Sequence, residues 1–422
     1  MKSHFPIINY FEKKHIIYAD SAATTLKLKT VIDSVSNFYS FETSNVFRGL
    51  HLLAETATEK VEMSRDIVAA FIGANSSEIV FTSGATESIN IVANGIEYED
   101  DSEIIVSILE HHSNYLPWIE KAKVISLEID EYGYIDIEQL RDNITCKTKL
   151  IAVTYISNVT GNIQPIKNII DIAHQNGINV LVDATQAISH IPIDVKEIDC
   201  DYLVFSSHKI FGPSGVGVLY CKDSLLDKLN ILKFGGGMVN RSNRNIIYKD
   251  PPYSFEAGTP NIEGIIGLGA SLDFFRNNRL AIYNHLRALN AYIVDKFRQF
   301  DFVKFPFVLS KEHIPIFSIL PHNTILNSLE VAKNFVNILD EKELMADMLN
   351  TGITKDINVY IGEENEKDEL KDFSIVTFKH RIGNKDLGTI GIIGPKRMDY
   401  AKVISVMKYI SKKLNDNNNS NE

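Results

Sequence analysis

Short apolar runs rich in β-branched residues alternate with longer helical patterns through most of this chain. The runs are EIVFT, EIIVSI, KVISLEI, LIAVTYI, NVLVDA and CDYLVFS. The helical pattern before NVLVDA ends at Gly177, a residue suited to a C-cap, and its apolar face comprises Ile166, Ile169, Ile170 and Ala173. Such alternation predicts an α/β fold, with a mostly parallel sheet covered by helices on both faces. Ligands of such sheets bind beyond the carboxyl ends of the strands, where functional residues are therefore expected.

Length and composition limit the classes of protein to consider. At 422 residues the chain exceeds one ordinary core, so we expect two domains or a large α/β domain with a smaller companion. Lysine and arginine number 43 against 54 aspartate and glutamate, and the net charge of −11 disfavours nucleic acid and anionic membranes as partners. No apolar stretch approaches the roughly 20 residues that span a bilayer. Three cysteines without metal-binding spacing fit a reducing cytoplasm and indicate no metal site.

Two of the strand ends carry features of an anion site and a buried acid. After EIVFT, a glycine turn opens a helix with Ala85 and Thr86 near its N-terminus, where free N–H groups favour a phosphate. An ordinary capped helix explains the same residues. Asp183 follows the strand NVLV, with Gln186 three residues later, and a helix cap is the simpler interpretation of that aspartate.

Two further strand ends carry basic groups. His111, after EIIVSI, has the chemistry to stack on a planar ring, whereas metal chelation by the adjacent His111 and His112 is disfavoured because neighbouring side chains point different ways. Lys209 follows CDYLVFS, and a lysine in such a buried setting loses its proton readily and forms Schiff bases. A surface charge is the alternative. Together, the four strand ends supply a phosphate cradle, a carboxylate for a pyridinium nitrogen, a stacking ring and an amine, which predicts a site for pyridoxal 5'-phosphate.

Residues from about 15 to 325 resemble the SufS-like cysteine desulfurases, which are class V members of the fold-type I aminotransferase superfamily. The matching stretches are DSAATT, FRGLHLLAETATEKVE, SGATESINIVANG, EHHSNYLPW, SNVTGNIQPI, VLVDATQAISHIPIDV, DCDYLVFSSHKIFGPSGVGVLY and FEAGTPNIEGIIGLGA. The resemblance implies a fold-type I pyridoxal-phosphate domain over residues 1–325 and L-cysteine as the substrate.

The same resemblance implies roles for individual residues. Lys209 would form the Schiff base, His111 would stack on the ring, and Asp183 and Gln186 would hold the ring nitrogen and ring oxygen. The residues implied at the phosphate are Ala85, Thr86, Ser206 and His208. Thr259 would reach the phosphate of a partner subunit, which implies a homodimer, and Asn158 would hold the substrate carboxylate.

The chain departs from this family toward its C-terminus. The family forms a persulfide on a cysteine in a pattern like RxGHHCA, and an arginine of the small domain clamps the substrate carboxylate. No cysteine follows Cys221 here, and Arg381 and Arg397 lie in sequence that does not match the clamp. We therefore expect cofactor binding without full desulfuration, and no sulfur-acceptor protein.

The segment 329–414 instead resembles the C-terminal part of the heat-inducible transcription repressors of the HrcA family. IGEEN, ELKDFSIVT and GTIGIIGPKRMDY carry the resemblance, which implies part of a GAF-like domain. The pattern predicts a smaller α+β segment with helices over 329–350 and 401–414 and a hairpin at GNKD, followed by a disordered tail over 415–422. The alternatives are therefore an impaired desulfurase, a pyridoxal-phosphate lyase or aminotransferase, and a chimeric regulatory or scaffold protein.

Overall fold

The computed structural model describes residues 2–14, 18, 20–47, 49–130, 132–241, 246–298, 357–361, 364, 373–382, 385–395 and 403–404. The chain divides into two compact units, of which the larger contains residues 1–291 and the smaller contains the C-terminal strands. The boundary predicted between residues 325 and 329 lies outside the described residues.

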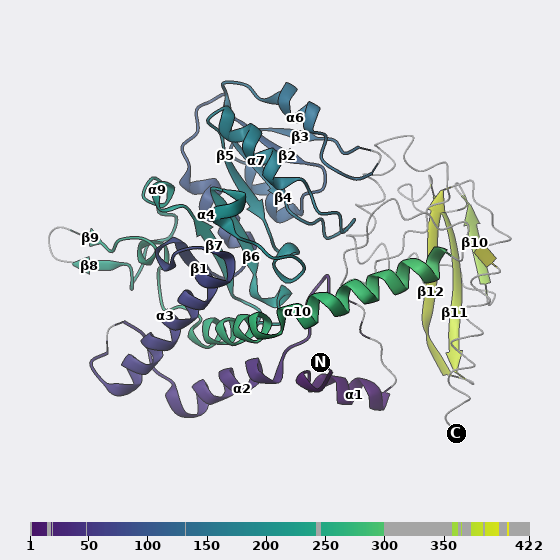
Figure 1. Ribbon diagram of the computed structural model, residues 1–422, viewed down its shortest axis with the longest axis horizontal. Helices are drawn as coiled ribbons and strands as arrows, with labels where there is room; N and C mark the ends of the chain where they lie inside the picture. Colours follow the sequence, from purple (N-terminus) through teal and green to yellow (C-terminus); the bar gives the residue numbers. More distant parts are fainter. Residues whose placement is uncertain are drawn as a thin grey trace. The chain divides into compact units, whose positions relative to one another are not determined.

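A seven-stranded sheet forms the centre of the larger unit, in the order β1-β7-β6-β5-β4-β2-β3 (Figure 1). Its strands are β1 (Ile79–Thr82), β2 (Glu103–Ser107), β3 (Lys123–Leu127), β4 (Thr148–Thr154), β5 (Asn179–Asp183), β6 (Tyr202–Ser206) and β7 (Gly217–Cys221). The five strands from β3 to β6 in this order pair in parallel, whereas β7 runs antiparallel to both β6 and β1. The mostly parallel sheet is thus confirmed, and β7 is a strand that the sequence patterns did not predict.

Helices cover both faces of this sheet. The described α-helices are α1 (Ile7–Lys14), α2 (Lys29–Asn37), α3 (Leu52–Ile72), α4 (Ala85–Gly95), α5 (Leu116–Ile119), α6 (Ile137–Asn143), α7 (Ile166–Gln175), α8 (Val195–Ile198), α9 (Asp223–Leu226) and α10 (Ile262–Arg298), of which α1 buries no residue. The apolar face predicted for α7 is buried, and Gly177 follows that helix with a left-handed φ of 71°. Glycine adopts this conformation without steric cost, so the predicted C-terminal stop is confirmed.

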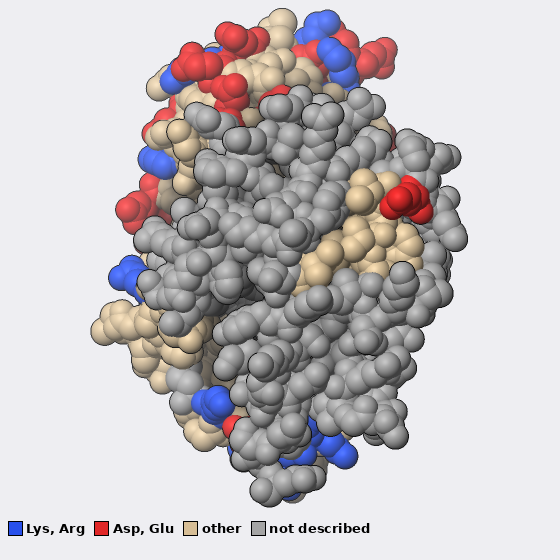
Figure 2. All heavy atoms as spheres, turned by 90° about the vertical axis from the view of Figure 1, so that its right-hand side faces the viewer, with Lys and Arg blue, Asp and Glu red and all other residues tan. Residues whose placement is uncertain are grey.

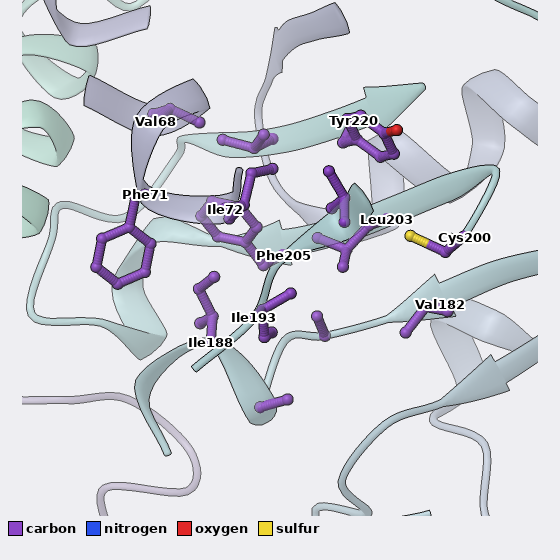
Figure 3. Close-up of a cluster of buried hydrophobic side chains, with 14 of the residues drawn as sticks. Val68, Phe71, Ile72, Val182, Ile188, Ile193, Cys200, Leu203, Phe205 and Tyr220 are labelled. Atoms are coloured by element: carbon purple, nitrogen blue, oxygen red, sulfur yellow. The ribbon is translucent and has the colours of Figure 1, made fainter. Parts of the chain in front are cut away.

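Alternation of side chains along the strands divides the core into two clusters. Ile105 of β2 packs in one cluster with residues of α3, α7 and α10, whereas its neighbours Ile104 and Val106 pack in the other with residues of α4, α5 and α9. Figure 3 shows part of the first cluster, where Phe71 of α3 and Phe205 of β6 lie among aliphatic side chains. Because successive strand residues face opposite ways, the continuous apolar runs of the sequence fill both clusters.

The smaller unit contains a three-stranded antiparallel sheet in the order β10-β11-β12. Its strands are β10 (Ile357–Ile361), β11 (Phe373–Ile382) and β12 (Lys385–Pro395). Ile382 pairs with Lys385, which confirms the hairpin predicted at GNKD. The helix predicted over 329–350, most of the one predicted over 401–414, and the tail over 415–422 lie outside the described residues.

No helix in the described ranges is long and apolar enough to cross a bilayer. In the view of Figure 2, acidic and basic side chains are intermixed on the described part of the surface, so that part shows no patch of a single charge sign.

Candidate active site

Lys209 and Gln186 converge on one backbone atom beyond the carboxyl ends of β5 and β6. Lys209 is the last residue of a 3₁₀ turn that directly follows β6, and its Nζ donates a hydrogen bond to the carbonyl oxygen of Ala22. Nε2 of Gln186 donates to the same oxygen at 3.0 Å. The N-terminal segment around Ala22 therefore closes over the strand ends, a relationship that no sequence pattern assigned.

Asp183, the last residue of β5, supplies a buried carboxylate beside this amine. Its side chain accepts a hydrogen bond from the backbone N–H of Thr185 at 2.9 Å. Burial raises the pKa of Asp183, and the charges of His111 and Lys209 act in the opposite direction. Burial lowers the pKa of Lys209, a shift that the charge of Asp183 partly offsets. The structure thus places both His111 and Lys209 within electrostatic range of Asp183.

The backbone next to Lys209 is held by the N-terminal segment. The carbonyl oxygen of His208 accepts hydrogen bonds from Thr25 through N at 3.0 Å and Oγ1 at 2.9 Å, and from Oγ1 of Thr24 and Nζ of Lys27, both at 3.4 Å. Burial and the charges of Lys209 and Lys27 lower the pKa of His208 to about 4, so its imidazole is neutral at pH 7. A neutral imidazole has one N–H to donate to a phosphate oxygen.

The turn before α4 brings together two of the residues predicted at the phosphate, Ala85 and Ser206. Gly84 is the N-cap of α4, and the backbone N–H of Ala85 donates to Oγ of Ser206 at 2.9 Å. Strand β7 passes so close to this turn that a Cβ added to Gly217 would lie 2.4 Å from the Cα of Gly84. Free N–H groups and small residues at a helix N-terminus are suited to phosphate binding.

The stacking candidate His111 is linked to this cradle through Ser113. The hydroxyl of Ser113 lies 3.0 Å from Nδ1 of His111 and 2.7 Å from Oγ1 of Thr86. The side chains predicted to contact the ring and the phosphate are therefore connected to one another by hydrogen bonds.

Two predicted residues, Thr259 and Asn158, have no described hydrogen bond to this group. Thr259 is exposed in the loop before α10, and Asn158 is half-buried in a turn after β4. None of the hydrogen bonds described for the chain joins either residue to Lys209 or Asp183. Their implied roles involve a partner subunit and a substrate, so they stay predictions.

The Aminotransferase class-V family matches residues 17–345, more than three quarters of the chain. This chain belongs to the class-V aminotransferase family. The cofactor of the family is pyridoxal 5'-phosphate, and the residues present fit it, because a buried carboxylate, a lysine of lowered pKa and a helix N-terminus meet at one edge of the sheet.

Cysteine desulfurases are among the proteins that this chain resembles. The chain is 41% identical over 322 residues to a probable cysteine desulfurase of Borreliella burgdorferi, covering 72% of this class-V aminotransferase and 76% of the relative. For a probable cysteine desulfurase of Halalkalibacterium halodurans the identity is 39% over 313 residues, with 71% and 77% covered.

Solved structures give the same result. A cysteine desulfurase from Thermococcus onnurineus superposes with a TM-score of 0.67 at 35% identity, covering 71% of this chain and 76% of that one. One from Escherichia coli gives a TM-score of 0.64 at 35% identity, covering 70% and 76%. The HrcA protein C terminal domain matches residues 318–404, in agreement with the second resemblance of the sequence.

Proposed function

We propose that this class-V aminotransferase is a cysteine desulfurase-type enzyme that binds L-cysteine and links its cofactor to Lys209. The observation that carries the proposal is the convergence of Lys209 and Gln186 on the carbonyl of Ala22, beside the buried carboxylate of Asp183. The similarity to cysteine desulfurases supports the choice of substrate. The test is a visible absorbance band that borohydride removes from the parent and that Lys209→Ala, which would lack the lysine linkage, does not show.

Each remaining residue has a role that its position supports. Asp183 holds a proton at the ring nitrogen, Gln186 donates to the ring oxygen and His111 lies against the ring face. The residues that hold the phosphate are Ala85, Thr86, Ser206 and His208. The bound cofactor supplies an electron sink for bond breaking at the substrate Cα. The lowered pKa of Lys209 favours its neutral amine, which takes up and returns the proton of that carbon through Nζ.

Sulfur transfer is expected to be impaired, because the cysteines lie near the starts of the parallel strands, whereas Lys209 lies beyond their carboxyl ends. Cys146 and Cys200 each precede the first residue of their parallel strand by two positions, and Cys221 pairs with Tyr202 at the start of β6. Lys209 follows the opposite end of β6. A strand of seven residues such as β4 spans about 23 Å, too far for a cysteine side chain to reach the amine within the same chain.

The chemistry of the two strand cysteines agrees with their position. Burial and the charge of Asp201 raise the pKa of the Cys200 and Cys221 thiols, so both stay protonated at neutral pH. The thiolate is the nucleophile in sulfur transfer. The sequence holds three cysteines in all, and none of them supplies the mobile-loop nucleophile that the family uses.

Release of sulfide and alanine from L-cysteine, with a reductant present, tests this impairment. The parent and a variant with all three cysteines changed to serine should show the same low rate. Rapid turnover in the parent that disappears in the variant would contradict the proposal. A parent that instead produces a keto acid from its amino-acid substrate would favour a lyase or an aminotransferase.

We also propose a homodimer, in which Thr259 of each subunit reaches the other subunit's phosphate. The exposure of Thr259 in the loop before α10 supports this arrangement. Sedimentation of the cofactor-loaded protein measures it directly, and a monomer with full cofactor occupancy would contradict the proposal.

The C-terminal segment supports a second candidate, a chimeric protein in which residues 329–414 have a regulatory or scaffold role beside a pyridoxal-phosphate domain over 1–325. The observation in its favour is the match of residues 318–404 to the HrcA C-terminal domain. A purified protein that binds no cofactor at saturating concentration would favour the scaffold role over an enzyme.

A further inference from the structure

Glu110 carries an enclosed carboxylate that none of the roles above uses. Oε1 accepts hydrogen bonds from Oγ of Ser107 at 2.5 Å and from the backbone N–H of Thr154 at 3.0 Å. Oε2 accepts from Nδ2 of Asn114 at 2.6 Å. The three donors come from the end of β2, the end of β4 and the 3₁₀ turn His112–Asn114, so one carboxylate joins three separate elements.

The contact with Thr154 extends the sheet beyond the end of β2. The last described pair between β2 and β4 is Val106 with Ala152, so β2 has separated from β4 before Thr154. The Glu110 carboxylate accepts from the backbone N–H of Thr154 in place of a further strand residue. An unpaired backbone N–H buried here would cost stability, which is why a side chain at this position matters to the strand ends.

The same strand end leads directly to Asp183. Thr154 lies opposite Asp183 in the register of β4 and β5, and the next N–H along β4, that of Tyr155, donates to the carbonyl oxygen of Asp183 at 2.9 Å. His111 follows Glu110 in the sequence and is the N-cap of the turn that contains Asn114. Glu110 therefore connects the loop that bears His111 with the strand end that bears Asp183.

A buried network extends from Glu110 to Trp118, which is the only tryptophan of the chain. The carboxamide of Asn114 donates to Glu110, and its oxygen accepts from Nε1 of Trp118 at 3.2 Å. Both Asn114 and Trp118 are 0% exposed. Burial raises the pKa of Glu110 to about 8 against the effect of its three hydrogen bonds, and the negative charge of Asp183, from β5, raises it further.

We propose that Glu110 is a positioning residue. It fixes the loop of His111 against the ends of β4 and β5. It thereby determines where His111, which contacts the ring face, lies relative to Asp183, which contacts the ring nitrogen. The inference rests on the proposed function, in which His111 and Asp183 contact that ring. Glu110 itself acts through its hydrogen bonds to Thr154, Ser107 and Asn114 and does not touch the ring.

Titration of the cofactor-free protein with pyridoxal 5'-phosphate tests the proposal, at about pH 9, where Glu110 with its pKa of about 8 is ionised. Glu110→Gln places an amide group where three donors require an acceptor, and we expect cofactor affinity about ten- to a hundredfold weaker, as for loss of a charge-assisted hydrogen bond. The matched control is Glu103→Gln. Glu103 lies at the other end of β2 and accepts hydrogen bonds from Lys123 at 2.8 Å and Thr145 at 2.7 Å, so its replacement should leave cofactor affinity within about twofold of the parent.

Two spectroscopic measurements separate positioning from general stabilisation. The visible circular dichroism of the bound cofactor reports ring orientation, and it should change in Glu110→Gln but not in Glu103→Gln. In the cofactor-free protein, the fluorescence of Trp118 should titrate with a midpoint near pH 8 that Glu110→Gln abolishes. This second measurement tests the network even if the parent binds no cofactor, a result that would defeat the proposed function separately.

Ser107→Ala serves as a milder variant, because it removes one donor to Glu110 and leaves the carboxylate in place. It should weaken cofactor binding about three- to tenfold. The inference is overturned if Glu110→Gln, or Ser107→Ala where the first variant does not fold, binds cofactor with the affinity and dichroism of the parent.

Discussion

Lys209 and Gln186 donate hydrogen bonds to the same acceptor, the carbonyl oxygen of Ala22. The acceptor is 164 positions away in sequence from one donor and 187 from the other. The candidate site is therefore completed by an N-terminal segment that lies far from the strands in sequence, and changes in that segment are expected to affect the chemistry of Lys209.

Replacement of Lys209 by alanine should abolish the visible absorbance band that borohydride removes. The reason is that no other described amine lies on the Ala22 carbonyl beside Asp183. Lys149→Ala is the matched control, since Lys149 lies on β4 and pairs with Glu99 at 2.8 Å, near the opposite edge of the sheet. If Lys209→Ala kept the band, Lys209 would not be the residue that is linked to the cofactor.

Asp183→Asn should stabilise the cofactor-free protein while weakening its affinity for the cofactor. The pKa of Asp183 is raised on folding, so the folded state holds its proton to higher pH than the unfolded state, and stability falls as the pH rises through that interval. Asparagine has no ionisable group, so the variant does not lose folding stability as the pH rises. Thermal unfolding at pH 4 and pH 7 measures the effect, which should be larger at pH 7. An unchanged midpoint at pH 7 would contradict the assignment of a destabilising buried carboxylate.

Gly217→Ala should destabilise the fold by about 1–3 kcal/mol, the usual cost of overpacking. Its new methyl group would lie 2.4 Å from the backbone of Gly84, where neither β7 nor the turn before α4 can move independently. Gly236→Ala is the control, because a Cβ there meets nothing within 4 Å. Chemical denaturation of both variants provides the measurement, and equal stabilities would show that β7 and the turn before α4 separate more easily than the structure indicates.

Glu256→Ala should lower the free energy of unfolding by about 3 kcal/mol, because it removes the closer of the two carboxylates that pair with a buried guanidinium and leaves only Glu62 at 3.3 Å. Arg65 is 1% exposed and its Nη1 lies 2.7 Å from Oε1 of Glu256, an atom that also accepts from the backbone N–H of Phe81. Asp273→Ala breaks an exposed pair with Arg276 and should cost less than about 1 kcal/mol. Similar losses in the two variants would mean that water reaches Arg65.

The parallel strands and most of the candidate site could be predicted from the sequence, because strand ends of one parallel sheet share an edge. Asp183 ends a predicted strand, His111 and Lys209 each come three residues after one, and the structure places both within electrostatic range of Asp183. Strand β7 was missed because Gly217 weakens its strand pattern, although its run GVLYC is apolar and fully buried.

Residues that act through the backbone could not be predicted from patterns. The contribution of Ala22 is a carbonyl oxygen, which every residue possesses, so its side chain gives no signal. Glu110 precedes the paired histidines and looks like a solvated charge until the positions of Thr154 and Asn114 are known. The one sequence signal available for this group is a charged residue in the short loop that follows a mostly apolar strand.

The four donors on the carbonyl oxygen of His208 determine how Lys209 can move. With Thr24, Thr25 and Lys27 bonded to that oxygen, the peptide plane between His208 and Lys209 cannot rotate without breaking several hydrogen bonds together. The travel of the amine between the Ala22 carbonyl and a cofactor is therefore confined to the torsions of the lysine side chain. The backbone of Lys209 stays in place, and the four methylene groups of its side chain limit how far Nζ can move.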